Sequence, residues 1–293
     1  MNNDVLSMIS EKITHLSKGQ KLIAGYILNH YDKAAFMTAS KLGDIVGVSE
    51  STVVRFAFEL GYDGYPGLQK ALQEMIRNRL TAVQRIEVAN EQLGNEEVLD
   101  KVLNLDIERI RRTLEETSRD DFNGAVNSIA NARNIYILGS RSAASLARFI
   151  SYYFNLMFAN VKLVHTTSSG EMFEQIMRVN EEDVMIGISF PRYSKRTATA
   201  LSYAKSKKAK VVAITDSISS PLVKESDYFL QARSDMASFV DSLVAPLSLI
   251  NALIVAVGLK KTEEITQTFN QLEEIWDKYE VYEKAEDQKK NEI

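Results

Sequence analysis

Residues 38–72 read TASKLGDIVGVSESTVVRFAFELGYDGYPGLQKAL, and this stretch predicts two short helices joined by a tight turn. The helices are expected at Lys41–Val46 and Glu50–Leu60, with Gly47-Val48-Ser49 as the turn between them. The Ser49 hydroxyl is expected to cap the second helix, and Gly61 to end it in a left-handed conformation. This outline is typical of a helix-turn-helix.

The second helix has two faces of different chemistry when its residues are placed on a helical wheel. The face expected to pack carries the apolar side chains Val53, Phe56, Ala57 and Leu60. The opposite face carries Ser51, Arg55 and Glu59, with Thr52 at its edge. In a helix-turn-helix the start of this helix enters the DNA major groove, where hydroxyls approach base edges and arginine bonds guanine through two hydrogen bonds.

The sequence therefore predicts a local DNA-contacting surface at the start of this helix. Its expected members are Lys41, Ser49, Ser51, Thr52 and Arg55, with Arg55 as the first choice for a base contact. Lys41, Lys70, Arg77 and Arg79 are candidates for phosphate contacts, which position the protein without selecting a sequence. The alternative is a small helical bundle in which Arg55 is only a solvated surface residue.

The run GVSESTVVRFAFELGYDGYPGLQ resembles the signature of RpiR-family regulators, with a GVS turn, a TVVRF recognition helix and a following LGY segment. The resemblance covers roughly the first 77 residues. It implies a transcription regulator with a second, sugar-phosphate-binding domain after the helix-turn-helix. It also implies a homodimer or homotetramer that binds a palindromic double-stranded DNA operator, because two-fold protein symmetry is mirrored in the operator.

After Arg119 the sequence changes character, because short β-rich runs alternate with helical segments. The expected strands are Asn134–Leu138, Val161–Val164, Asp183–Ser189, Lys210–Thr215 and Asp227–Leu230. Such alternation indicates βαβ units and a parallel sheet. Several of these runs are continuously apolar, as expected for strands that helices cover on both faces. We therefore expect an α/β three-layer domain.

Two polar loops follow strands of this sheet and predict a phosphate site. The first is Ser140-Arg141-Ser142, which comes after the turn at Gly139 and opens a helix; the second follows Ser189 in SFPRYSKRT. Open parallel sheets bind ligands at the carboxyl ends of their strands, and helix N-termini suit anions. The expected effector-binding residues are Gly139, Ser140, Arg141, Ser142, Ser189, Arg192, Tyr193, Ser194 and Thr197. Alternatively, Lys195 and Arg196 merely begin a solvated helix.

Residues 120–260 resemble the SIS domain, a sugar-phosphate isomerase and binding fold, which implies a five-stranded parallel sheet. The resemblance supports the roles of Ser189, Ser194 and Thr197. Two departures stand out. Arg141 and Ala143 occupy the positions of the second glycine and the serine in the usual G-x-G-x-S loop, and the usual S-x-S-G-x-T loop is lengthened. The resemblance therefore implies a phosphorylated sugar as effector, held in a modified site.

The expected organisation is an all-α helix-turn-helix domain at 1–77, a helical linker at 78–119, the SIS domain at 120–260, and an amphipathic helix with a polar tail at 261–293. A charged helix from Glu96 to Thr117 is the expected linker helix. We expect the effector to change operator affinity through this helix. The expected function is regulation of carbohydrate metabolism genes.

The composition argues against several other kinds of protein. The net charge of -4 argues against a protein that coats nucleic acid nonspecifically, and the absence of cysteine excludes disulfides and thiolate metal sites. His15, His30 and His165 are scattered, so no metal or cofactor is expected. No signal peptide is evident, so a cytoplasmic location is expected. The apolar stretch Leu243–Leu259 is interrupted by polar residues and predicts a buried helix rather than a membrane span.

An SIS-type sugar-phosphate isomerase is the alternative function, because His165, Glu171 and Glu174 are candidate acids and bases. They are more simply explained as residues at the start of a helix, where acids interact favourably with the helix dipole. No catalytic residue is assigned. A purely structural or protein-binding module is the third possibility, and it leaves both the recognition helix and the cationic loop unexplained.

Overall fold

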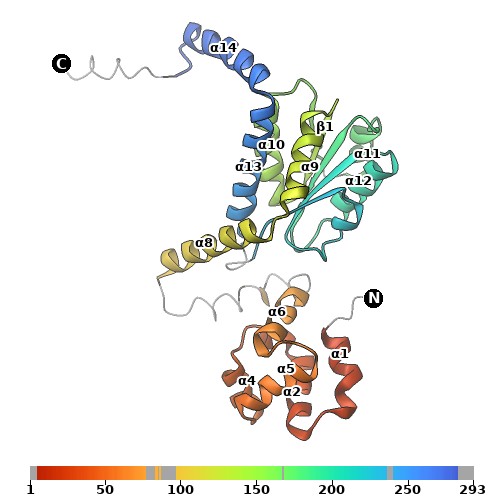
Figure 1. The fold of residues 1–293 in the computed structure, drawn as a ribbon, viewed down its shortest axis with the longest axis vertical. Coiled ribbons are helices and arrows are strands. Elements are labelled where there is room, and N and C mark those ends of the chain that lie inside the picture. The colour runs from red at the N-terminus through yellow and green to blue at the C-terminus, as the bar shows by residue number, and fades with distance from the viewer. Residues whose placement is uncertain are drawn as a thin grey trace, which may run out of the picture. The chain divides into compact units, whose positions relative to one another are not determined.

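The structure is a computed structural model, and it describes residues 5–76, 83–84, 86, 97–166, 168–235 and 240–282. The chain divides into two compact units (Figure 1). The first comprises residues 1–107 with 235–242, and the second comprises residues 108–234 with 243–293. Helix α8 (Val98–Glu116) is continuous across the boundary at residue 107.

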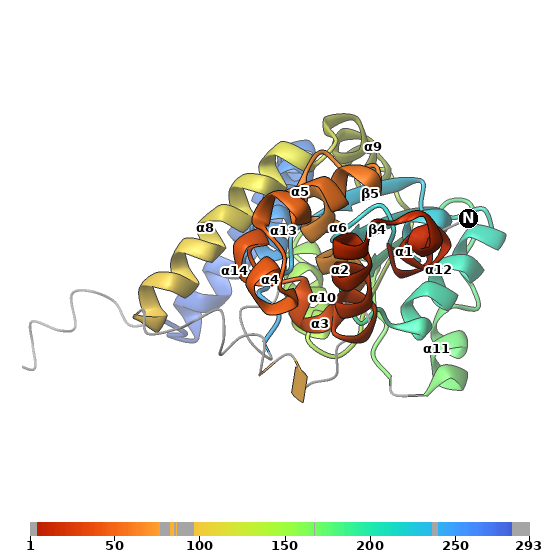
Figure 2. The ribbon, with the colours of Figure 1, turned by 90° about the horizontal axis from the view of Figure 1, so that it is seen from below.

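The first unit is helical in the part that the structure describes. Its helices before α8 are α1 (Val5–Lys12), the 3-10 turn Ile13–His15, α2 (Lys18–Asn29), α3 (Tyr31–Ala34), α4 (Ala39–Val46), α5 (Glu50–Glu59) and α6 (Tyr65–Ile76). Helices α2, α4 and α5 pack on one another (Figure 2). The predicted helix-turn-helix is therefore present, with α4 starting two residues earlier than expected because Thr38 caps it by accepting from the Lys41 N–H at 3.2 Å.

The core of this unit is formed by apolar side chains that recur at helical spacing. Ile23 and Ile27 of α2, Leu42 of α4 and Phe56 of α5 are all fully buried. Tyr65 of α6 is also buried, and its hydroxyl donates to the Met37 carbonyl at 2.8 Å. Burial raises the pKa of Tyr65 to about 12. This hydrogen bond fixes α6 against the segment that precedes α4.

The second unit is an α/β domain. After α8 come α9 (Arg119–Ala130), β1 (Ile135–Gly139), α10 (Ala143–Phe154), β2 (Val161–Leu163), α11 (Ser169–Ile176), β3 (Val184–Ile188) and α12 (Lys195–Ser206). The chain continues through β4 (Lys210–Thr215), the 3-10 turn Val223–Glu225, β5 (Tyr228–Gln231), α13 (Val244–Lys260) and α14 (Thr262–Lys278). The five predicted strands are confirmed, with ends that differ by at most one residue.

The strands form one parallel sheet in the order β2-β1-β3-β4-β5. Because β1 and β3 are neighbours but not consecutive, the chain changes direction across the sheet between them. Open sheets bind ligands at such switch points. The register pairs Gly139 with Ile188, so β1 and β3 end side by side. The loops that follow these two strands therefore start at the same edge.

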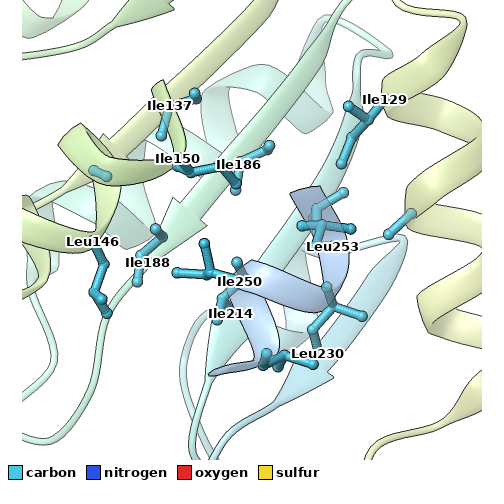
Figure 3. Close-up of a cluster of buried hydrophobic side chains, with 14 of the residues drawn as sticks. Ile129, Ile137, Leu146, Ile150, Ile186, Ile188, Ile214, Leu230, Ile250 and Leu253 are labelled. Carbon is cyan, nitrogen blue, oxygen red and sulfur yellow. The ribbon is translucent and has the colours of Figure 1, made fainter. Parts of the chain in front are cut away.

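Helices cover both faces of the sheet, as predicted for continuously apolar strands. Ile129 of α9, Ile150 of α10 and Ile250 of α13 pack against Ile186 and Ile214 on one face (Figure 3). The other face is covered by α11 and α12 through a second group of buried side chains, which includes Met172, Ile176, Leu201 and Ala204. The predicted three-layer architecture is confirmed.

The long apolar stretch expected as a buried helix forms α13, and the predicted C-terminal amphipathic helix forms α14. Among the described residues no single helix is long and apolar enough to cross a membrane. Helices α13 and α14 reach that length only together, and their axes differ by 96°. The polar tail expected beyond α14 lies outside the described residues from position 283 onward, as does most of the linker segment between 77 and 96.

Candidate functional site

The turn between α4 and α5 depends on two glycines. Gly47 ends α4 with a left-handed backbone (φ 73°), and the Val48 N–H donates to the Gly43 carbonyl at 2.9 Å. A Cβ at Gly43 would lie 2.7 Å from the Val48 carbonyl oxygen, much closer than real Cβ contacts. The close approach of the two helices therefore requires glycine at 43 and favours it at 47.

The prediction that the Ser49 hydroxyl caps α5 is wrong. Ser49 has the extended backbone of an N-cap residue, but its side chain makes no capping hydrogen bond. Its Oγ lies 2.9 Å from both Ser51 Oγ and Thr52 Oγ1, because the hydroxyls of the first turn are within reach and compete with the backbone N–H groups. The Ser49 carbonyl begins the helix by accepting from the Thr52 N–H at 2.9 Å. Three hydroxyls thus form one cluster at the start of α5.

The end of α5 matches the prediction that Gly61 ends the helix in a left-handed conformation. Gly61 has a left-handed backbone with φ 94°. The Tyr62 N–H donates to the Ala57 carbonyl at 3.0 Å, and the Gly61 N–H donates to the Phe58 carbonyl at 2.9 Å. This pair of hydrogen bonds is a Schellman motif, which satisfies the last carbonyls of the helix.

The two predicted faces of α5 are present in the structure. The packing face is almost inaccessible to solvent and comprises Val53, Phe56, Ala57 and Leu60. Ser51, Arg55 and Glu59 are exposed, and Thr52 is half-buried. The Arg55 Nε donates to the Ser51 carbonyl at 3.3 Å, so the guanidinium lies along the first turn beside a shallow surface hollow. The exposed Lys41 lies in the first turn of α4.

The positions and contacts of several other residues near this surface could not be predicted from the sequence. Phe58 is 56% exposed on α5 although the aromatic side chain suggests a core position. The Lys12 Nζ donates to the Glu59 carbonyl at 2.7 Å and so satisfies the C-terminal end of α5. Gly19 of α2 lies against Thr52, since a Cβ there would be 3.4 Å from Thr52 Cγ2. Of the predicted phosphate contacts, Lys70 is exposed, while Arg77 and Arg79 lie outside the described residues.

The first predicted effector loop is shaped by a close approach between β1 and α10. A Cβ at Gly139 would lie 2.4 Å from the Ala143 carbonyl oxygen, so only glycine fits this turn. Arg141 is exposed and has a left-handed backbone with φ 59°, a conformation that non-glycine residues rarely adopt. The arginine at the position of the usual second glycine thus retains a backbone that glycine favours. Ser142, which precedes α10, is exposed as well.

The second loop folds on itself through three hydroxyl residues. The Ser189 Oγ accepts from the Ser194 N–H at 3.0 Å, and the Ser194 Oγ accepts from the Thr197 N–H at 3.2 Å and caps α12. Thr197 is buried, and its Oγ1 lies 3.4 Å from the Ser140 Oγ of the first loop. The structure therefore brings Ser140, Ser189, Ser194 and Thr197 together where β1 and β3 end.

Tyr193 extends this network to β4. Its hydroxyl donates to the Asp216 Oδ1 at 2.8 Å, and the Thr215 hydroxyl lies 3.3 Å from the same oxygen. Asp216 is buried and was missed by the sequence reasoning. The available signal was its position, because it directly follows the apolar run of β4 and so lies at the ligand-binding edge.

The cationic residues of the second loop have different surroundings. Arg192 and Lys195 are exposed. Arg196 is half-buried, and its NH1 donates to the Thr166 carbonyl at 2.6 Å. Lys195 and Arg196 do begin α12, as the alternative interpretation states, but Arg196 is not a merely solvated residue, since its guanidinium joins α12 to the segment after β2.

The candidate acids and bases of the isomerase alternative lie near the start of α11. His165, Glu171 and Glu174 are all exposed. The Ser168 side chain caps α11 by accepting from the Glu171 N–H at 3.5 Å, and the Glu171 carboxylate accepts from the Thr166 hydroxyl. Glu171 thus has the helix-start position that was expected from the helix dipole.

The end of α8 is joined to the end of β5 by hydrogen bonds. The Arg233 N–H donates to Thr113 Oγ1 at 2.9 Å, and the Thr117 hydroxyl donates to the Gln231 carbonyl at 2.8 Å. The buried Arg233 guanidinium also pairs with Glu116. Burial alone would raise the pKa of Glu116, but the hydrogen bonds and charges of Arg233 and Arg112 outweigh it and lower the pKa. We call this group of residues the α8–β5 joint.

These features define a protein that combines a helix-turn-helix with a sugar-phosphate-isomerase type of α/β domain. The profile of the helix-turn-helix domain of the rpiR family matches residues 3–79, and the profile of the SIS domain matches residues 128–256. The chain belongs to the RpiR family of HTH-type transcriptional regulators.

Known proteins resemble this chain in sequence and in fold. An uncharacterized HTH-type transcriptional regulator of Clostridium perfringens is 25% identical over 258 residues, which cover 86% of this chain and 91% of that protein. The sugar isomerase domain of an RpiR transcription factor from Sphaerobacter thermophilus is 24% identical, with a TM-score of 0.58, and covers 61% of this chain and 99% of that one. The NanR protein of Vibrio vulnificus, solved with ManNAc-6P, is 20% identical, with a TM-score of 0.58, and covers 94% and 98%.

Proposed function

We propose that this regulator controls carbohydrate metabolism genes and that a phosphorylated sugar bound in its SIS domain changes its affinity for the operator. The observation that carries the proposal is the contact of Ser140 with Thr197, which joins the loops after β1 and β3. This is the edge where open parallel sheets bind ligands. The same chain carries an rpiR-family helix-turn-helix.

For DNA binding, α5 enters the major groove and presents its first turn to the bases. Arg55 contacts guanine, the hydroxyl cluster of Ser49, Ser51 and Thr52 lies near base edges, and Lys41 contacts a phosphate. The exposure of Ser51 and Arg55 opposite a fully buried packing face supports this orientation. Two copies of the protein bind the two halves of a palindromic operator.

For effector binding, the phosphate lies between the two loops at the ends of β1 and β3. Arg141 and Arg192 are exposed and supply positive charge, while Ser140 and Thr197 supply hydroxyls. Ser189 and Ser194 fix the second loop by accepting from backbone N–H groups. Gly139, Ser142 and Tyr193 complete the site by shaping its loops. Because the similar NanR structure contains ManNAc-6P, amino-sugar phosphates are among the first compounds to test.

The α8–β5 joint is the proposed route from effector to DNA. It connects α8, which leads from the first unit, to the carboxyl end of β5 at the effector edge of the sheet. A movement of the carboxyl end of β5 is therefore transmitted to α8 through direct hydrogen bonds. Such coupling is typically about 1–3 kcal/mol and requires the effector to bind the two states with different affinity.

A thermal-shift screen of sugar phosphates and amino-sugar phosphates tests the effector half, with inorganic phosphate and the unphosphorylated sugars as controls. A ligand that binds only the folded protein stabilises it by about 2.7 kcal/mol at 100 times its Kd. The Arg192→Ala variant should lose the shift yet bind DNA normally without ligand. No shift with any phosphorylated sugar would contradict the proposal. Turnover of a hit without any DNA binding would also contradict it and would favour the isomerase.

A further inference from the structure

Phe58 is an exposed aromatic side chain on the side of α5 that we propose to face DNA, and the contacts proposed so far give it no role. At about 100° per residue it lies roughly 20° around the helix from Ser51 and roughly 60° from Arg55. The buried packing face, which includes Phe56 and Leu60, lies on the opposite side. Scattered exposed apolar residues need no explanation. Phe58, however, is 56% exposed on the same surface as Ser51 and Arg55.

The turn after α5 supports the Phe58 ring from one side. A Cβ at Gly64 would lie 3.8 Å from Phe58 Cζ, which is an ordinary van der Waals distance. Gly64 itself has a left-handed backbone with φ 83°. The contact limits the two side-chain torsions of Phe58 while more than half of the side chain stays accessible. The ring is therefore held in place before any ligand covers it, which lowers the entropy cost of binding.

Val54 extends the apolar surface by one helical turn. It precedes Phe58 by four residues, so the two side chains are neighbours on the helix surface. Val54 is half-buried and belongs to the rim of the shallow hollow that Ser51 and Arg55 also line. An apolar strip of Val54 and Phe58 thus runs beside the hydroxyls and the guanidinium of α5.

Helix α5 has little positive charge for a helix that enters DNA. Arg55 is its only cation, against the acids Glu50 and Glu59. The attraction to phosphates must therefore come mainly from other parts of the protein. Base recognition by α5 depends on short-range contacts, which are hydrogen bonds from Arg55 and the hydroxyls and apolar contact from the strip. The C5-methyl group of thymine is the apolar group that base edges present in the major groove.

We infer that Phe58 contacts the C5-methyl group of a thymine in the major groove and so selects thymine over cytosine at one operator position. The inference rests on the proposed function, in which α5 enters that groove. Phe58 follows Arg55 by three residues, which is about 4.5 Å along the helix axis. Stacked bases are about 3.4 Å apart. The thymine therefore lies within about three base pairs of the guanine that Arg55 contacts.

Removal of single methyl groups from the DNA tests this contact. The probe is a duplex that the wild-type chain selects from a random-sequence pool, with each thymine replaced in turn by deoxyuridine, which lacks only the C5-methyl group. Fluorescence anisotropy should reveal a position where this replacement weakens wild-type binding by about fourfold, the effect of one buried methyl group. Phe58→Ala should bind the unmodified duplex more weakly than wild type and should show no further loss at that position.

Three further variants separate the methyl contact from general effects. Phe58→Leu keeps an apolar side chain and should retain most of the deoxyuridine effect. Arg55→Ala removes a different contact and should retain the effect in full. Ile45→Ala is the matched control, because Ile45 is a 46% exposed apolar residue of α4 in the same unit, and it should also retain the effect. The melting temperature of Phe58→Ala should stay close to that of wild type, since the side chain lies outside the buried core.

The deoxyuridine series also distinguishes failure of this inference from failure of the proposed function. A wild-type chain that selects a DNA sequence but is insensitive to every deoxyuridine would overturn the inference alone. A deoxyuridine effect of equal size in wild type and Phe58→Ala would overturn it too, as would an effect that only Val54→Ala abolishes. Failure of the wild-type chain to select any DNA sequence would contradict the proposed function, and the inference with it.

Discussion

The guanidinium of Arg233 and the carboxylate of Glu116 form an ion pair between the end of β5 and the end of α8. The two partners are unequally buried, since the Arg233 side chain is 6% exposed and the Glu116 side chain is 27% exposed. Among the described residues the buried Arg233 Nε has no hydrogen-bond partner, so the guanidinium depends on Glu116 for compensation of its charge. The two residues are separated by more than a hundred positions in the sequence, and their pairing holds α8 on the sheet.

Removal of the acid should therefore destabilise the second unit strongly. We predict that Glu116→Ala lowers the free energy of unfolding by roughly 2–3 kcal/mol, because it leaves the Arg233 charge buried without its partner. Thermal or urea unfolding followed by circular dichroism measures the loss. Arg112→Ala is the control, since Arg112 contacts the same carboxylate at 3.4 Å but is 32% exposed, and it should cost less than about 1 kcal/mol. Equal losses in the two variants would show that the buried pair has no special role.

Acid should destabilise the sheet through Asp183, which is buried at the start of β3. Burial alone would raise the pKa of Asp183, but hydrogen bonds from Arg133, Asn134 and the Asn180 N–H, together with the Arg133 charge, outweigh it and lower the pKa. A carboxyl whose pKa is lower in the folded state stabilises the protein above its unfolded pKa, near 4, and this stability is lost as the pH falls below that value.

The melting temperature should therefore fall more steeply with acid in wild type than in Asp183→Asn. Asp227 and Glu116 also have lowered pKa values, so the variant should lose only part of the pH dependence. Melting curves between about pH 6 and pH 3 compare the two slopes. Parallel slopes would mean that Asp183 is not a source of the acid sensitivity.

Local patterns were sufficient to predict most of the architecture. The strands were predictable because a continuously apolar strand must be buried on both faces, as in a sheet that helices cover on both sides. The two faces of α5 followed from helical periodicity. Strand ends shifted by a residue because hydrogen-bond pairing with neighbouring strands, rather than the run itself, decides where a strand stops.

Hydrogen bonds of polar side chains were not predictable where neighbouring groups compete for one hydroxyl or where the partner is distant in the sequence. The Ser49 hydroxyl was expected to cap α5, yet two neighbouring hydroxyls compete with the backbone for it. Asp216 could be placed at the ligand-binding edge by its position directly after β4, but the pairing of Asp216 with Tyr193 and of Arg233 with Glu116 had no signal, because the partners come from other elements. Composition and periodicity describe which side chains are buried, but the pairing of buried polar groups is decided by the three-dimensional fold.

Gly139, in the first effector loop, should not tolerate a side chain. We predict that Gly139→Ala lowers the free energy of unfolding by roughly 2 kcal/mol or more, because its Cβ would lie 2.4 Å from the Ala143 carbonyl oxygen. Gly25→Ala is the matched control within α2, where a Cβ would meet no atom within 4 Å. That variant should be more stable than wild type by about 0.5–1 kcal/mol. Unfolding curves that rank the two variants in the opposite order would contradict the structure of the β1–α10 turn.

Arg55 should contribute to both affinity and base preference. Arg55→Ala is predicted to weaken binding to a mapped operator by roughly 1–3 kcal/mol and to relax the preference at one base position. Lys41→Ala should instead weaken binding to all sequences and reduce the salt dependence. Fluorescence anisotropy with the operator and with single-base variants, at several salt concentrations, separates the two effects. Unchanged operator affinity in Arg55→Ala would remove Arg55 from the base-contacting surface.

Arg141 allows stability and effector binding to be tested separately at one position. Its left-handed backbone, φ 59°, costs a non-glycine residue about 1–2 kcal/mol, whereas glycine adopts it freely but loses about 0.5–1 kcal/mol more entropy on folding. Arg141→Gly should therefore raise the free energy of unfolding by up to about 1 kcal/mol. Arg141→Ala keeps the unfavourable backbone and should not. Both variants lose the guanidinium, so both should weaken the thermal shift produced by a phosphorylated sugar. A normal shift in both would show that the exposed guanidinium is not part of the effector site, and a stability gain in Arg141→Ala would show that the backbone conformation is not the cause.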